Sequence, residues 1–214
     1  VPDVEMPPVS SRTMTGTGVA KKEDEIKTVD ILVFDASKTP AVFLEWVSGT
    51  GITQDLANDN STANFSAVLS PTTVSTCIVV VANRELDGIA SKFKKGETTK
   101  VQAMEAMLHT RTSKWTADGS TSGGYTPIPM YGETEVVKIT PSMNPITGIN
   151  MKRMLARIDI RNSASNFTVE EVYLANYNTI GYIAPAWDAN GKLKDPAPDA
   201  PNLPADGGKK TEEG

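Results

Sequence analysis

The sequence predicts an all-β protein made of two β-sandwich domains, the second of them incomplete in this chain. Three observations favour this fold class. Apolar or alternating runs of strand length recur along the chain. Turns rich in Gly, Pro, Asn and Asp separate these runs. Only one segment has the apolar spacing of a helix. Many strands with a single short helix are typical of a sandwich rather than of an α/β fold.

Composition sets the broad class of the protein. Of its 214 residues, 39% are hydrophobic and 22% are charged, which favours a packed core over a disordered chain. The net charge of −5 and the pI near 5.0 argue against nucleic acid as a partner, because a basic face is missing. No apolar run is long enough to span a membrane. The opening VPDVEMPPVSS lacks a signal-peptide pattern, so the chain is expected to be either cytosolic or already processed.

Residues 1–25 are expected to form a loosely held N-terminal arm, because they are rich in Pro, Gly and charge. Arg12 stands alone in this arm and is an accessible site for a trypsin-like protease. Residues 26–147 are predicted to form the first sandwich. Its expected strands are Ile26–Asp35, Ala41–Val47, Ala63–Leu69, Thr73–Ala82 and Glu133–Ile139. Thr73–Ala82 is the longest β-branched run and is predicted to be central.

The expected helix is Thr99–His109. Thr99 followed by Gln102 is typical of a capping box, and Val101, Met104, Met107 and Leu108 form an apolar stripe. We interpret it as a short surface helix lying on the sandwich.

The second domain is expected to start at residues 148–187. From Met154, the stretch Asn150–Asn162 (NMKRMLARIDIRN) alternates apolar and charged residues, which predicts a half-buried strand. Phe167–Tyr182 is predicted to contain at least one more strand, with a bulge where the apolar phase shifts. Residues 188–214 are expected to be a loop or a disordered tail. This leaves the second sandwich with too few strands to close by itself.

No motif in the sequence assigns catalytic roles to particular residues. We therefore predict that the protein is not an enzyme and binds no cofactor and no metal. The single histidine, His109, is interpreted as interacting with the C-terminus of the helix. The single cysteine, Cys77, lies in an apolar run and is interpreted as a buried thiol. Asp188–Gly191 resembles part of a calcium loop, but a turn is the favoured interpretation.

The Ser/Thr/Gly-rich stretch of residues 110–129 suggests a second class of function. Loops of this length are often functional, and Trp115 and Tyr125 offer stacking surfaces for a sugar. The alternative hypothesis is therefore a glycan-binding or adhesin module that acts as a monomer or as a capping or tip subunit. Local packing of these aromatic side chains is the favoured interpretation.

Four motifs in order carry a family resemblance: EDEIKTVDILVFD, VSTCIVVVAN, IPMYGE, and KRMLARIDIRN followed by FTVEEVYLANYNTIGYIAP. Together they resemble the fimbrillins of Bacteroidales, the FimA-like and Mfa-like subunits and accessory proteins of type V pili, over about Gly16 to Pro185. The resemblance implies two transthyretin-like (Ig-like) β-sandwich domains in a structural protein of the cell surface.

The resemblance also implies a mode of assembly. Fimbrillins are exported as lipoproteins to the outer membrane, are cut by an arginine-specific protease, and polymerise by donor-strand exchange to support adhesion. Arg12, just before TMTGTG, resembles the arginine at which fimbrillins are cleaved. Val19–Phe34 is the expected region of the groove that a donated strand fills. Implied partners are other pilin subunits, the processing protease, and a host protein or glycan. The aromatic strands expected after Tyr182 are missing, so the chain is either a fragment of a longer subunit or a member that assembles differently.

Overall fold

The computed structural model describes residues 24–54, 62–110, 127–134, 137–141, 145–155, 160, 162–163, 165–194, 203–204 and 210–213, and all structural statements concern these residues. Most of the described elements are antiparallel strands, which confirms the predicted all-β class. The main sheet has five strands in the order β2-β1-β5-β7-β8. These are β1 (Val29–Asp35), β2 (Val42–Ser48), β5 (Thr76–Ala82), β7 (Met130–Glu133) and β8 (Lys152–Arg153).

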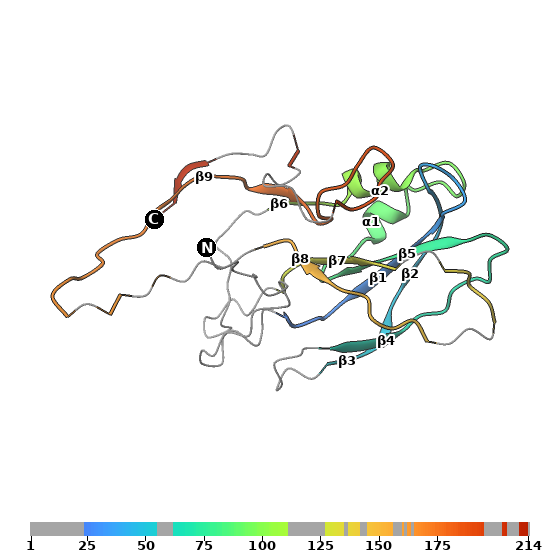
Figure 1. Cartoon of the computed structure of the whole chain (residues 1–214), viewed down its shortest axis with the longest axis horizontal. Helices are drawn as coiled ribbons and strands as arrows, with labels where there is room; N and C mark the ends of the chain where they lie inside the picture. Colours follow the sequence, from blue (N-terminus) through green and yellow to red (C-terminus); the bar gives the residue numbers. More distant parts are fainter. Residues whose placement is uncertain are drawn as a thin grey trace, which may run out of the picture.

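Three two-stranded ribbons and two short helices complete the described elements (Figure 1). The ribbons pair β3 (Thr50–Gln54) with β4 (Ala63–Ser66), β6 (Leu108–Thr110) with β10 (Ile180–Tyr182), and β9 (Leu174–Tyr177) with β11 (Lys210–Glu213). The helices are α1 (Asp87–Ala90) and α2 (Lys100–Ala106). Both helices lie on one side of the main sheet, and the β3–β4 ribbon lies on the other (Figure 1).

Strands β1 and β5 form the centre of the main sheet, and every residue in both is buried. Their side chains alternate between two apolar clusters. Leu32 and Val79 face the helices, whereas Ile31 and Val80 face the β3–β4 ribbon. This arrangement confirms the prediction that the first strand is covered on both faces and that the β-branched run around β5 is central, because strands buried on both sides are largely apolar. The buried Asp30 of β1 is an exception, and its carboxylate accepts from Trp46 Nε1–H and Ser48 Oγ–H.

The predicted helix is present as α2, and its N-cap, Thr99, makes both halves of the capping box with Gln102. The helix ends earlier than predicted, since Leu108 and His109 belong to β6. It lies on the sandwich as predicted, with Met104 of its apolar stripe fully buried and Gln102 and Glu105 exposed. The four-residue helix α1 was not predicted, and its short sequence holds no helical repeat that would reveal it.

Gly132 allows residues 149–151 to lie in close contact with strand β7. A Cβ at this position would lie 2.6 Å from Met151 Sδ and 3.0 Å from the backbone oxygen of Asn150. Only a glycine therefore allows residues 149–151 to pack against this strand. The strand predicted at Glu133–Ile139 is offset from the observed one: β7 ends at Glu133, and Val137 makes an isolated bridge with Thr76.

The second half of the chain departs further from the sequence-based expectation. Within the described part of the stretch Asn150–Asn162, the strand is limited to β8, which pairs with β7 at the edge of the main sheet. Ile183 and Trp187 pack into the cluster beneath the helices. The predicted strands in Phe167–Tyr182 are present as β9 and β10. The predicted tail is wrong for Lys210–Glu213, which form β11 because β9 offers them a backbone edge.

Candidate functional site

The sheet edges are the natural surfaces for assembly in a protein of this class, because an edge strand offers free backbone groups to a partner strand. The predicted groove region began at Val19 and ended at Phe34. Its described strand, β1, is paired with β2 on one side and with β5 on the other. Both backbone edges of β1 are thus occupied, and this part of the expected groove is not an acceptor edge.

Strand β2 is the outer strand at one end of the sheet, and its two halves differ. Near its start, Phe43 N–H donates to Thr98 O at 2.8 Å, and Gly96 N–H donates to Phe43 O at 2.7 Å, so the turn before α2 covers this part of the edge. Further along, the Glu45 carboxylate accepts from Ser70 N–H and Ser70 Oγ at 2.8 and 2.7 Å. A shallow depression beside this contact is lined by Leu44, Pro71 and Lys95, among others.

Strand β8 lies at the other end of the sheet and is tied to the N-terminal side of the chain. Arg153 Nη1 lies 2.7 Å from Asp24 Oδ1, and both side chains are about one-third exposed. Asp24 lies between the predicted processing residue, Arg12, and β1. Asp24, near the end of the predicted arm, is therefore fastened beside β8.

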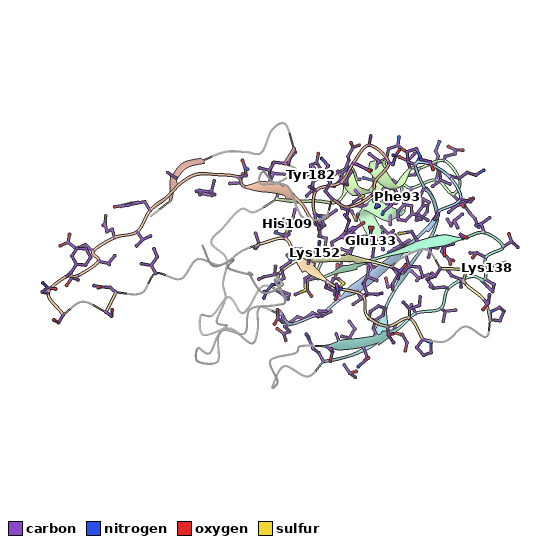
Figure 2. All side chains as sticks on the ribbon, viewed as in Figure 1. Phe93, His109, Glu133, Lys138, Lys152 and Tyr182 are labelled. Carbon is purple, nitrogen blue, oxygen red and sulfur yellow. The ribbon has the colours of Figure 1, made fainter. Side chains whose placement is uncertain are left out.

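A buried polar cluster lies between α2 and the main sheet, and Figure 2 labels one member, Glu133. Glu133 Oε2 accepts from Lys100 Nζ at 2.7 Å and from the Tyr131 hydroxyl at 2.9 Å. Burial, and next the charge of Glu133, raises the pKa of Tyr131 well above its ordinary value. Because the carboxylate is paired with an ammonium and a phenol, the cluster is satisfied internally and fixes how α2 docks on the sheet.

Cys77 borders the same cluster and is buried, as predicted. Its Sγ lies 3.7 Å from Thr134 O. Burial raises the pKa of the Cys77 thiol, and the neighbouring Lys100 opposes that effect in part. A protonated, enclosed thiol is a packing group rather than a nucleophile.

His109 lies in β6, where it is opposite Gly181, rather than at the end of a helix. Burial lowers the pKa of His109 and the positive charge of Arg84 lowers it further. The expected favourable interaction with a helix C-terminus is therefore wrong, since that interaction raises the pKa of a histidine. Figure 2 labels His109 and Tyr182, which lie in the paired strands β6 and β10.

The depressed pKa of His109 predicts a loss of stability in mild acid. Below a pH of about 6.5, the unfolded chain binds a proton that the folded chain resists, so the free energy of unfolding falls as the pH falls. Since His109 is the only histidine in the sequence, this residue dominates the change between about pH 7 and 5.5. Urea denaturation at both pH values is expected to show the loss, and His109→Gln is expected to reduce it. An equal loss in the variant would contradict the assignment.

The Asp188–Gly191 segment is a turn, as predicted. Asp188 Oδ1 accepts from the backbone N–H groups of Asn190 and Lys192 at 2.8 and 3.0 Å. The bond from Lys192, followed by that from Asn190, lowers the pKa of Asp188. Across the described residues, no group of three His, Cys, Asp or Glu side chains is placed to hold a metal.

Arg12, Trp115 and Tyr125 all lie outside the described residues, so the processing site and the ligand-contact loop stay predictions. No helix in the described ranges is both long and apolar enough to cross a membrane.

One surface feature was missed by the sequence analysis. The segment that leads into β9, Phe167–Tyr173, is exposed along its whole length although it carries several large apolar side chains. The signal was available as the shift in apolar phase between Val169 and Val172, which shows that no single face of this strand is apolar throughout.

Comparison with known proteins identifies the family. The model of the fimbrillin-A associated anchor proteins Mfa1 and Mfa2 matches residues 14–211, which is most of the chain. No curated protein and no solved structure matches it. The family is fimbrial, so the chain is a structural protein of a surface appendage that associates with other fimbrial subunits. This agrees with the four strand motifs, and the chain belongs to the family of fimbrillin-A associated anchor proteins Mfa1 and Mfa2.

Proposed function

We propose that this chain is a non-enzymatic structural subunit of a type V fimbria that assembles by protease-triggered donor-strand exchange and supports cell adhesion. The observation that carries the proposal is the family match over residues 14–211, which begins just beyond Arg12. In this proposal the subunit is exported, reaches the outer membrane as a lipoprotein precursor, and has two transthyretin-like sandwich domains with a boundary near residue 147.

The arrangement of the N-terminal side supports a role for processing. The Asp24–Arg153 ion pair fastens the chain that follows the arm to edge strand β8. The next residues are held as well, because Asn83 Nδ2 donates to Glu25 O at 2.8 Å. In this proposal, cleavage at Arg12 removes residues 1–12 and leaves the body intact from Asp24 onward. A sheet edge freed by such a cut would present its N–H and C=O groups to a donated strand.

The test is to treat the purified chain with an arginine-specific protease, to sequence the new N-terminus, and to follow particle size by light scattering. The expected result is one cut after Arg12 followed by growth into oligomers. Arg12→Gln is the matched control, and it is expected to stay uncut and monomeric. A clean cut that leaves a stable monomer would overturn donor-strand exchange by this chain alone, and an intact Arg12 would overturn the processing site.

A further inference from the structure

Lys100 and Glu133 form an ion pair that the interior of the protein largely encloses. Lys100 Nζ lies 2.7 Å from Glu133 Oε2, and both side chains are mostly buried. The turn at Gly191 lies over the lysine stem, since a Cβ at this glycine would be 3.5 Å from Lys100 Cβ and Cγ. Burying two full charges is costly, because the interior replaces the hydration of each ion poorly. A reaction that removes both charges is therefore favoured at this place.

Both groups of the pair are held in position by the backbone around them. Lys100 opens α2, where its N–H donates to Ala41 O at 2.7 Å. Glu133 ends β7 and is paired with Val79 of β5. A nitrogen 2.7 Å from one carboxylate oxygen lies within about 4 Å of the carboxyl carbon, because a C–O bond is only about 1.2 Å long. The amine is thus close to the separation of about 3–3.5 Å from which it can attack that carbon.

The Tyr131 hydroxyl adds a proton donor at the same carboxylate. It donates to Glu133 Oε2 at 2.9 Å, and the two side chains share one face of β7 because they are two residues apart. Tyr131 is fully buried. Burial, followed by the charge of Glu133, raises the pKa of Tyr131 well above its ordinary value, so the hydroxyl keeps its proton. Such a donor stabilises negative charge that develops on a carboxyl oxygen when the carbon is attacked.

We propose that Lys100 and Glu133 condense to an intramolecular amide, so that the folded chain cross-links itself between the start of α2 and the end of β7. One proton first passes from the ammonium to the carboxylate, which leaves a neutral amine and a carboxylic acid. The amine lone pair then attacks Glu133 Cδ, and the N–Cδ bond forms while the bond between Cδ and Oε2 breaks. Oε2 leaves as water with the carboxyl proton and one proton from the nitrogen, which the Tyr131 hydroxyl relays. Water is the only other product.

The amide would join two positions that are 33 residues apart in the sequence. It restricts the unfolded chain by closing a loop, as a disulfide does. A chain pulled from both sides would carry the force through the cross-link, and the residues between 100 and 133 would not be drawn out. This inference goes beyond the proposed role in assembly and does not depend on it.

Intact-mass spectrometry of the purified, denatured chain tests the cross-link. The measured mass is expected to be lower than the mass of the sequence by one water molecule. Trypsin is expected to leave the bond after Lys100 uncut and to release one branched peptide that joins residues 96–111 to residues 115–138. Lys100→Arg keeps the positive charge but cannot form this amide, so it is expected to have the full mass of its sequence. Lys94→Arg, in the exposed pair with Glu97, is the matched control and is expected to keep the loss of water.

Tyr131→Phe tests the proton relay, because it keeps the ring and removes the hydroxyl. Cell-free synthesis with mass measurement at intervals is expected to show the loss of water at least about a hundredfold more slowly than in the wild type. An equal rate in this variant would overturn the role given to the tyrosine.

The cross-link itself would be overturned by a wild-type chain of full mass, by a loss of water that persists in Lys100→Arg, or by a branched peptide that joins other residues. The wild-type mass decides the question even if a variant fails to fold. The measurement also needs no protease treatment before denaturation, so the cross-link and the proposed assembly fail separately.

Discussion

Replacing Lys100 by methionine is expected to lower the free energy of unfolding by about 3–5 kcal/mol, because the change leaves a buried carboxylate without its ammonium partner. The Lys100 and Glu133 side chains are only 6% and 19% exposed, and their charged atoms lie 2.7 Å apart. After the substitution, the Glu133 carboxylate would lose its ammonium donor and keep the hydrogen bond from the Tyr131 hydroxyl. Urea denaturation followed by circular dichroism measures the loss.

Two variants separate the buried charge from general effects of losing a lysine. Lys94→Met removes an ion pair with Glu97 whose side chains are 75% and 71% exposed, and it is expected to change stability by less than about 0.5 kcal/mol. The double variant Lys100→Met/Glu133→Leu is expected to recover part of the loss, since neither charge stays buried but the buried Tyr131 hydroxyl loses its acceptor. If Lys100→Met were no more harmful than Lys94→Met, the cluster would not hold α2 on the sheet.

Asn83 is expected to be the most sensitive single residue at the end of β5. It has a φ of 59°, in the left-handed region, and its side chain makes three hydrogen bonds of 2.8 Å, to Lys27 N–H, Glu25 O and Ile128 O. Asn83→Gly removes these bonds but tolerates the backbone conformation, so a loss of about 2–3 kcal/mol is expected. Asn83→Ala adds the cost of a positive φ, about 1 kcal/mol more.

The difference between the two Asn83 variants is the decisive measurement. Thermal and urea unfolding of both proteins is expected to rank the wild type first, glycine second and alanine third. A glycine variant as stable as the wild type would mean that the three side-chain bonds contribute nothing to stability. Equal losses for glycine and alanine would mean that the backbone conformation relaxes when the side chain is removed.

The sequence by itself determined the local elements that depend on a single short-range effect, such as the burial of an apolar strand or the capping of a helix. β1 and β5 are mostly apolar, with Asp30, Asp35 and Thr76 as the polar exceptions, so burial on both faces followed largely from composition and period. The start of α2 followed from its capping box, which acts within four residues. The buried thiol of Cys77 and the turn at Asp188 are equally local, and each was predicted correctly.

The tertiary structure alone decided which distant segments meet. The Lys100–Glu133 pair joins residues 33 positions apart, and the Arg153–Asp24 pair joins residues 129 positions apart. β8 pairs with β7 at the sheet edge, a contact that the sequence pattern around Lys152 does not specify. Periodicity encodes which faces are apolar, whereas the choice of partner depends on long-range packing that no local pattern records.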